Sequence, residues 1–395
     1  MNPIRNPYSP GAGNKPPELA GRENVIEQAD LMFERMRAGN SVQPMILNGL
    51  RGVGKTVLLR RMHDAAKASG YEVVFAEATE GKPLPDLLVV GLRKALLNLS
   101  MIEAAKDRAK RSLGALKAFV AGFGVSIGEY ALTYDPTLGV ADSGDLETDL
   151  GDIFAEVGEA AAAANKCVVL FVDELQILEK TELGALIAAI HRISQQGLPV
   201  TIIGAGLPQV LGLAGSAKSY AERLFIFPRI DALGEEEAAC AIEHPANALG
   251  VQFEADAVAE ILRVTERYPY FLQQWSYCAW NIAQDEKTIT WNDVVEATDV
   301  AREKLDESFF RVRYDRCTPA EKNYLRGLAE LGKGTQRSSE VAVQLGCDMD
   351  KANQQRTTLI KKAMIYSPAY GDICFTVPLF DEFMRREMPD FVPHS

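Results

Sequence analysis

Cysteine is scarce in this chain of 395 residues, and its six cysteines are scattered without C-x-x-C spacing. This spacing indicates neither a disulfide framework nor a zinc site, so we expect buried free thiols in a reducing compartment. The N-terminal residues also lack the basic-then-apolar pattern of a signal peptide. One long uncharged stretch, residues 193–217, contains two prolines and five glycines, which argue against a membrane-spanning helix. We therefore expect a cytoplasmic protein without membrane contact.

Acidic residues outnumber basic residues in the whole chain, and the excess of acidic residues varies along it. The formal net charge is −12. Residues 313–395 hold 12 basic and 11 acidic side chains, whereas the 312 residues before them hold 30 and 43. The acidic part would repel a nucleic-acid backbone, and the nearly neutral C-terminal part would not. If the protein binds DNA, we expect residues 313–395 to do so.

An apolar run from residue 45 leads through Gly-Leu-Arg-Gly-Val-Gly-Lys-Thr into an amphipathic helical pattern. Strand, glycine-rich loop and helix in this order are the context of a phosphate-binding P-loop. The glycines allow a tight turn whose N–H groups point at phosphates, and the helix N-terminus adds to the attraction. We expect Lys55 to reach the β- and γ-phosphates and the Thr56 hydroxyl to ligate Mg²⁺. The residues predicted to contact the nucleotide here are Gly49, Leu50, Arg51, Gly52, Val53, Gly54, Lys55, Thr56 and Val57.

A second apolar run, residues 167–172, ends in the carboxylates Asp173 and Glu174. An unbroken apolar run is typical of a strand buried on both faces of a parallel sheet. We expect this strand to end beside the P-loop, where Asp173 holds Mg²⁺ directly or through a water molecule. Glu174 is then placed to polarise the attacking water as the general base. Lys55 and Glu174 are thus predicted catalytic residues.

Strand and helix patterns alternate from residue 21 to residue 232, which predicts an α/β domain with a mostly parallel sheet covered on both faces. Residues 222–230 are expected to form the last strand of this sheet. Residues 1–20, rich in proline and glycine, are expected to form an extended arm. Residues 101–145 resemble an insertion with a basic helix, which either contacts a partner or is a solvated helix with a surface loop. Residues 233–312 turn helical and are predicted to be a lid domain beside the nucleotide site.

Residues 313–395 are expected to form a third domain. Thr318, followed by proline and by Glu321, predicts a capped helix start. Two more helices are expected at residues 338–345 and 350–362, followed by two short strands joined by a turn. Three helices and a hairpin are the element order of a winged helix-turn-helix.

With both phosphate motifs, the lid and the C-terminal domain, almost the whole chain resembles the AAA+/STAND-type P-loop ATPases. The nearest groups are the archaeal ATPases and the origin-recognition ATPases. Gly21 and Arg22 begin a Gly-Arg-Glu sequence similar to the box that precedes the P-loop in these groups and lies over the adenine and ribose. The resemblance implies an AAA+/ASCE-type core, ATP and ADP as ligands, Mg²⁺ as cofactor, ATP hydrolysis that is slow in many members, and the capacity for self-association.

The resemblance also singles out residues beyond the P-loop. Arg223 lies in a segment similar to the one that carries the arginine finger, which meets the γ-phosphate of a neighbour or of its own chain; a salt-bridged surface arginine is the alternative. Arg267 stands where the Gly-x-Pro motif of the lid has glycine, and it is a candidate sensor-2-like cation if the lid closes. At the end of the strand 199–206, where the group keeps a polar sensor-1 residue, Thr201 and Gln209 are the nearest polar side chains.

Two functions from different classes remain open. The third helix of the C-terminal domain has a net charge of +3 and carries Asn, Gln and Arg side chains suited to base edges. This favours an ATP-dependent switch that binds double-stranded DNA. The nearly neutral domain and the non-basic turn at residues 369–372 fit instead a signalling switch with a protein partner. A metabolic kinase is disfavoured because the lid and the C-terminal domain leave no acceptor-substrate domain.

Overall fold

The computed structural model of the protein divides into two compact units. The sheet unit comprises Arg22–Gly49 and Lys55–Ile230, and the helical unit comprises Met1–Gly21, Leu50–Gly54 and Asp231–Ser395. The residues described are 1–11, 13–14, 16, 18–124, 136–137, 139–285 and 287–392, so the predicted insertion at 101–145 lies only partly among them. Within these ranges, no helix is both long and apolar enough to cross a membrane.

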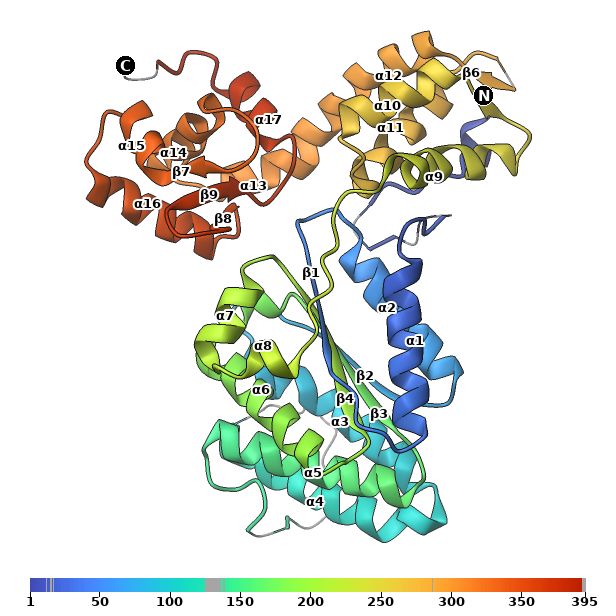
Figure 1. Ribbon diagram of the computed structural model, residues 1–395, viewed down its shortest axis with the longest axis vertical. Helices are drawn as coiled ribbons and strands as arrows, with labels where there is room; N and C mark the ends of the chain where they lie inside the picture. The colour runs from blue at the N-terminus through green and yellow to red at the C-terminus, as the bar shows by residue number, and fades with distance from the viewer. Residues whose placement is uncertain are drawn as a thin grey trace. The chain divides into compact units, whose positions relative to one another are not determined.

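A parallel sheet forms the centre of the sheet unit (Figure 1). Its strands are β1 (Met45–Asn48), β2 (Glu72–Glu77), β3 (Val168–Asp173) and β4 (Val200–Gly206), in the spatial order β1-β4-β3-β2. Ile226 and Arg229 make further parallel bridges to β1. The expected last strand, residues 222–230, is therefore present only as these two isolated bridges, and its first residues belong to a short helix, α8 (Ala221–Leu224).

Helices cover both faces of this sheet, as the sequence predicts. Side chains two residues apart on a strand share a face. Leu170 and Val172 of β3 belong to the hydrophobic core that α3, α4, α5 and α6 form. The ring of Phe171 between them lies 5.4 Å from the ring of His63 on α2, on the opposite face. The helices are α1 (Glu23–Arg37), α2 (Lys55–Ala68), α3 (Leu84–Ser100), α4 (Lys106–Phe123), α5 (Leu146–Ala163), α6 (Lys180–Gln195) and α7 (Val210–Ala217), with 3-10 turns at Glu103–Ala105 and Leu175–Ile177.

The basic helix of the predicted insertion is α4, and it is packed rather than solvated. Leu113 and Leu116 are fully buried. Arg108 pairs with Glu159 of α5 at 2.5 Å, and Arg111 pairs with a second α5 carboxylate at 3.3 Å. These two cations thus neutralise acidic side chains of the same unit.

The helical unit contains the predicted lid helices and the C-terminal module. A continuous helical run joins the two, because α12 passes directly into a π-helix, η4, and then into α13. Two-residue strands β5 (Gln252–Phe253) and β6 (Thr288–Ile289) pair in the lid region, and a three-stranded sheet of order β7-β9-β8 lies in the C-terminal module. The lid elements are α9 (Glu235–Asn247), α10 (Ala255–Thr265), α11 (Pro269–Ile282), α12 (Trp291–Lys304), η4 (Leu305–Phe310) and α13 (Arg311–Asp315). The C-terminal elements are α14 (Pro319–Glu330), β7 (Gln336–Arg337), α15 (Ser338–Gln344), α16 (Met349–Lys361), β8 (Ile365–Tyr366), β9 (Asp372–Phe375) and α17 (Phe380–Glu387).

The first residues of the chain, expected to form an extended arm, contain a 3-10 turn (Pro3–Arg5) and pack into the lid region. The ring of Tyr8 meets Phe253 and Trp280 edge-on, with centroids 6.4 Å apart in both pairs. Trp280 Nε1 also donates a hydrogen bond to the carbonyl of Asn2 at 3.1 Å. The arm is thus part of the hydrophobic core of the helical unit.

Replacing Tyr8 by alanine is expected to destabilise the helical unit by about 3 kcal/mol, because a large buried ring leaves a cavity. Tyr8 is 3% exposed, whereas Ile4 is 93% exposed, so Ile4→Ala is the matched control. The three tryptophans, at positions 275, 280 and 291, all lie in this unit. Urea unfolding followed by tryptophan fluorescence measures the difference; equal midpoints for the two variants would show that the arm contributes no stability.

Candidate functional site

The P-loop begins where β1 ends. Gly49 donates its N–H to the carbonyl of Gly206, the last residue of β4, at 3.3 Å. Lys55 opens α2, and its buried Nζ donates a hydrogen bond to the Gly49 carbonyl at 2.8 Å. The ammonium group is therefore held over the beginning of the loop, as expected for a lysine that binds phosphates.

Two glycines in the loop have backbone angles that disfavour side chains. Gly52 has φ of +83° and Gly54 has φ of +91°, both in the left-handed region. A Cβ on Gly54 would meet no atom within 4 Å, so the backbone angle rather than crowding requires glycine there. Such a turn lets successive N–H groups converge on an anion.

Asp173 and Thr56 form the candidate magnesium site. Asp173 is the last residue of β3, and its buried carboxylate is hydrogen-bonded to the side chain of Thr56. It also accepts the N–H of Glu174 at 2.8 Å. Burial raises the pKa of Asp173 above its usual value, and the hydrogen bonds from Thr56 and Glu174 act in the opposite direction.

The donor set fits Mg²⁺. The ion prefers hard oxygen ligands and keeps several water molecules, so one hydroxyl and one carboxylate suffice beside phosphate oxygens. No cluster of three or more histidine, cysteine or carboxylate ligands occurs in the described part of the chain. Thr56 and Asp173 are therefore the residues that would hold the ion.

Glu174 follows Asp173 with φ of +55°, a left-handed conformation that is uncommon for a residue with a side chain. This conformation costs about 1–2 kcal/mol in a residue other than glycine. Such strain gathers at functional sites. The turn leads the chain from β3 into the Leu175–Ile177 3-10 turn.

Gln176 contacts the predicted general base, and no sequence pattern singled it out. Its Nε2 donates a hydrogen bond to Glu174 Oε2. Its Oε1 accepts the N–H of Leu207, directly after β4, at 2.8 Å. The one signal in the sequence is a polar residue in the otherwise apolar run that follows Glu174.

Neither of the two polar residues nearest this strand end, Thr201 and Gln209, lies at the tip of β4. Thr201 is buried and pairs in register with Val169, near the amino end of β4. Five residues separate it from Gly206, or about 16 Å along a strand. Gln209 lies three residues beyond Gly206, and its buried Oε1 has no hydrogen-bond partner among the described residues.

Arg223 is exposed on α8, away from the carboxyl end of β1 where the P-loop begins. Its carbonyl accepts a hydrogen bond from Gln43 Nε2 at 3.3 Å. Gln43 lies just before β1, and the P-loop begins just after β1. Gln43 and the start of the P-loop are therefore about 20 Å apart along the extended chain. Arg223 therefore lies near the amino end of β1, and the P-loop follows the other end of that strand.

The other predicted contacts lie near the beginning of the chain and in the lid. Arg22 is the N-cap residue of α1. Gly21 has φ of +69°, and a Cβ there would lie 3.1 Å from Glu237 Cγ. Arg267 is exposed between α10 and α11 with φ of +60°, a backbone conformation that favours glycine. In the same helical unit, Tyr270 donates its N–H to the carbonyl of Gly52 at 3.2 Å, so α11 begins at the P-loop tip.

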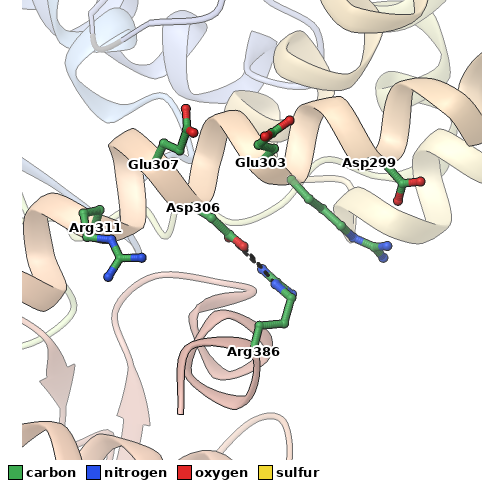
Figure 2. Close-up of a pocket in the computed structure, with 7 residues that line it drawn as sticks. Asp299, Glu303, Asp306, Glu307, Arg311 and Arg386 are labelled. Carbon is green, nitrogen blue, oxygen red and sulfur yellow. Dashed lines mark hydrogen bonds and ion pairs between the residues drawn. The ribbon is translucent and has the colours of Figure 1, made fainter. Parts of the chain in front are cut away.

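A separate hollow in the helical unit is lined only by charged residues (Figure 2). They are Asp299, Arg302, Glu303, Asp306, Glu307, Arg311 and Arg386. Arg386 binds both oxygens of Asp306, at 2.9 and 2.7 Å, and Arg311 pairs with Glu387 of α17. The first pair fastens α17 to η4 and the second fastens it to α13, and together they neutralise two of the three cations.

Comparison with known proteins agrees with this geometry. Residues 18–203 match the family model of the AAA ATPase domain, and residues 307–384 match a domain of unknown function, DUF8462. No curated protein is significantly similar to the chain. The Walker-type ATPase PABY2304 of Pyrococcus abyssi is 15% identical with a TM-score of 0.57, covering 94% of this chain and 98% of that one.

Two further solved structures have lower TM-scores. The Aeropyrum pernix ORC1 protein, in complex with DNA, is 15% identical with a TM-score of 0.47, covering 98% of this chain and 96% of that one. The Thermotoga maritima RuvB Holliday junction branch migration motor is 16% identical with a TM-score of 0.45, covering 95% and 98%.

The fold is that of the P-loop ATPases. Within that class, the part of the chain that matches a family model is residues 18–203, which are similar to the AAA ATPase domain. The predicted α/β fold with a parallel sheet is confirmed.

Lys55→Ala is expected to weaken ATP binding at least about 100-fold, because the loss of a buried charge pair with phosphate costs several kcal/mol. Lys94→Ala, which removes an exposed lysine of α3, is the control. Fluorescence titration with an ATP analogue measures both; similar affinities would contradict the placement of the triphosphate at this loop.

Proposed function

We propose that this protein is a Mg²⁺-dependent ATPase that hydrolyses ATP slowly and uses the nucleotide as a conformational switch. The observation that carries this proposal is the hydrogen bond between Thr56 and Asp173, which brings the ends of the P-loop and of β3 together. Glu174 lies next to this pair, and Lys55 precedes Thr56 on α2. These are the four side chains that phosphoryl transfer to water requires.

The chemistry is mainly positioning and charge neutralisation, because phosphoryl transfer needs little covalent assistance. Lys55 and the loop N–H groups bind the triphosphate. Thr56 and Asp173 would hold Mg²⁺, which would supply further neutralisation of the phosphate charge. Glu174 orients the attacking water and accepts its proton. Arg223 of a neighbouring molecule and Arg267 are proposed as additional cations for the γ-phosphate.

The γ-phosphate is what distinguishes the ATP-bound from the ADP-bound protein. A ligand shifts a conformational equilibrium only by its difference in affinity for the two states. Any segment that is ordered by the γ-phosphate, and any contact made to it, is therefore lost when ATP is hydrolysed. A slow rate prolongs the ATP-bound state and suits a switch.

We further propose that the C-terminal module is a winged helix-turn-helix that binds duplex DNA through α16. Its exposed side chains include Asn353, Thr357 and Lys361, at spacings that share one helix face. Lys351 and Gln354 are exposed beside them. Amide side chains pair with adenine edges and lysines with phosphates.

One observation favours a protein partner instead. Three apolar side chains of this module are exposed: Val343 is 62%, Met349 44% and Tyr370 fully exposed. Asp348 and Asp350 flank Met349 at the beginning of α16, where a recognition helix contacts bases. An acidic and apolar helix start suits a protein surface better than a phosphate backbone.

Glu174→Gln is expected to bind ATP normally and to lose hydrolysis by about 100-fold or more, because the amide cannot accept the proton of the water. Glu77→Gln is the matched control, since Glu77 is exposed at the end of the neighbouring strand β2 and pairs with Asp173 in register. Phosphate release and nucleotide affinity are measured for both. Normal turnover in Glu174→Gln would exclude Glu174 as the base.

The DNA hypothesis predicts salt-dependent binding of the full chain to duplex DNA. Each of Lys351→Ala and Lys361→Ala should reduce the slope of log affinity against log salt by about 1, because one phosphate contact is lost. Lys94→Ala is the control. Fluorescence anisotropy at several salt concentrations makes the measurement. Absence of binding, or slopes that no α16 variant changes, would favour the protein partner.

A further inference from the structure

The side chain of Gln176 connects the general-base candidate Glu174 to the sheet. Gln176 lies two residues further on, in the 3-10 turn Leu175–Ile177. Its Nε2 donates to Glu174 Oε2, and its Oε1 accepts the N–H of Leu207 at 2.8 Å. A single amide thus connects the carboxylate to the end of β4.

The orientation of this amide is determined by its two partners. The backbone N–H of Leu207 is only a donor, so it must face the amide oxygen. The amide NH₂ is then left facing Glu174, whose ionised carboxylate is only an acceptor. A flipped amide would place donor against donor and acceptor against acceptor, so Gln176 holds Glu174 in one geometry.

The end of β4 is shaped to admit Gln176. A Cβ on Gly206 would lie 2.9 Å from Gln176 Oε1, closer than side-chain contacts ordinarily allow. The carbonyl of Gly206 accepts the N–H of Gly49 at the beginning of the P-loop. At this strand end, Gly206 therefore contacts the P-loop, and Leu207 contacts Gln176.

The same strand end carries no polar side chain of its own. Gly204, Gly206 and Leu207 supply none, and Thr201 lies near the other end of the strand. Gln176, in the turn that follows the neighbouring strand β3, places its side-chain amide at this otherwise apolar strand end.

We propose that Gln176 is a positioning residue for ATP hydrolysis, which connects the end of β4 to the carboxylate that orients the attacking water. The inference rests on the proposed hydrolysis and on Glu174 as its base. Glutamate has three side-chain torsions, and the charge-assisted bond from Gln176 restricts them. Displacing a catalytic group by about 1 Å lowers the rate by about 100-fold. We therefore expect the loss of this hydrogen bond to lower turnover and to leave nucleotide binding unchanged.

Two variants of Gln176 separate positioning of Glu174 from support of β4. Gln176→Ala removes both hydrogen bonds. Gln176→Glu keeps an oxygen that accepts from Leu207 but cannot donate to Glu174 when ionised. We expect kcat to fall about 10- to 100-fold in both variants, with the affinity for an ATP analogue within about twofold of wild type. Gln196→Ala, at an exposed glutamine after α6, is the control.

The outcomes distinguish the inference from the proposed function. Wild-type kcat in Gln176→Glu would overturn the inference and leave the ATPase proposal intact, because only the bond to β4 would then matter. Equal losses of affinity and turnover would indicate a structural role and would also overturn it. If the wild-type protein hydrolyses ATP no faster than Lys55→Ala, the proposed hydrolysis fails, and the inference fails with it.

A charge exchange tests the contact without measuring activity. Gln176→Glu places two carboxylates face to face, so its melting temperature should fall below that of the wild type. The double variant Glu174→Gln/Gln176→Glu restores one amide and one carboxylate and should recover most of this loss, while remaining inactive. No recovery would show that residues 174 and 176 do not contact each other in solution.

Discussion

Strand β4 lies between β1 and β3 and pairs in parallel with both, and the arrangement of the candidate site depends on this order. All strands of the sheet end at the same edge because they are parallel, so the P-loop after β1 and the carboxylates after β3 emerge on the same side. The end of β4 lies between the P-loop and these carboxylates, so its residues must have small side chains. A Cβ on Gly204 would lie 2.3 Å from Leu175 Cδ1, and one on Gly206 would meet Gln176. Small residues on β4 thus let the segments that follow its two neighbours, β1 and β3, contribute side chains to one place.

Electrostatics then determines what this edge binds. Asp173 is buried, and burial alone raises its pKa and disfavours its charged form. Thr56, the N–H of Glu174 and the charge of Lys55 partly offset that penalty. A divalent cation would complete the compensation, since buried carboxylates are stable when paired or bound to metal. The site is consequently better suited to a cation with its anionic ligand than to either one alone.

The helical unit depends on different interactions. Its N-terminal arm inserts Tyr8 between lid elements, and paired charges fasten α17 to the π-helix η4. In its C-terminal module, two of the cations that favoured DNA make internal contacts: Arg356 with Ser367 at 3.0 Å and Lys362 with Glu321 at 2.6 Å. These side chains help to hold α16 on its own module, which leaves the exposed residues of that helix to define the partner.

The sequence alone determined the P-loop, the Asp173 and Glu174 pair and most element boundaries, because each depends on neighbours within a few residues: glycine backbone freedom, apolar periodicity and helix caps. It also predicted the parallel sheet, since buried strands leave long apolar runs. Contacts between distant segments leave no such local pattern. Only the tertiary structure placed Gln176 between Glu174 and Leu207, Thr201 near the amino end of β4, Arg223 near the amino end of β1, and Tyr8 in the lid core. Strand order and packing decide these positions, and neither is encoded by spacing along the chain.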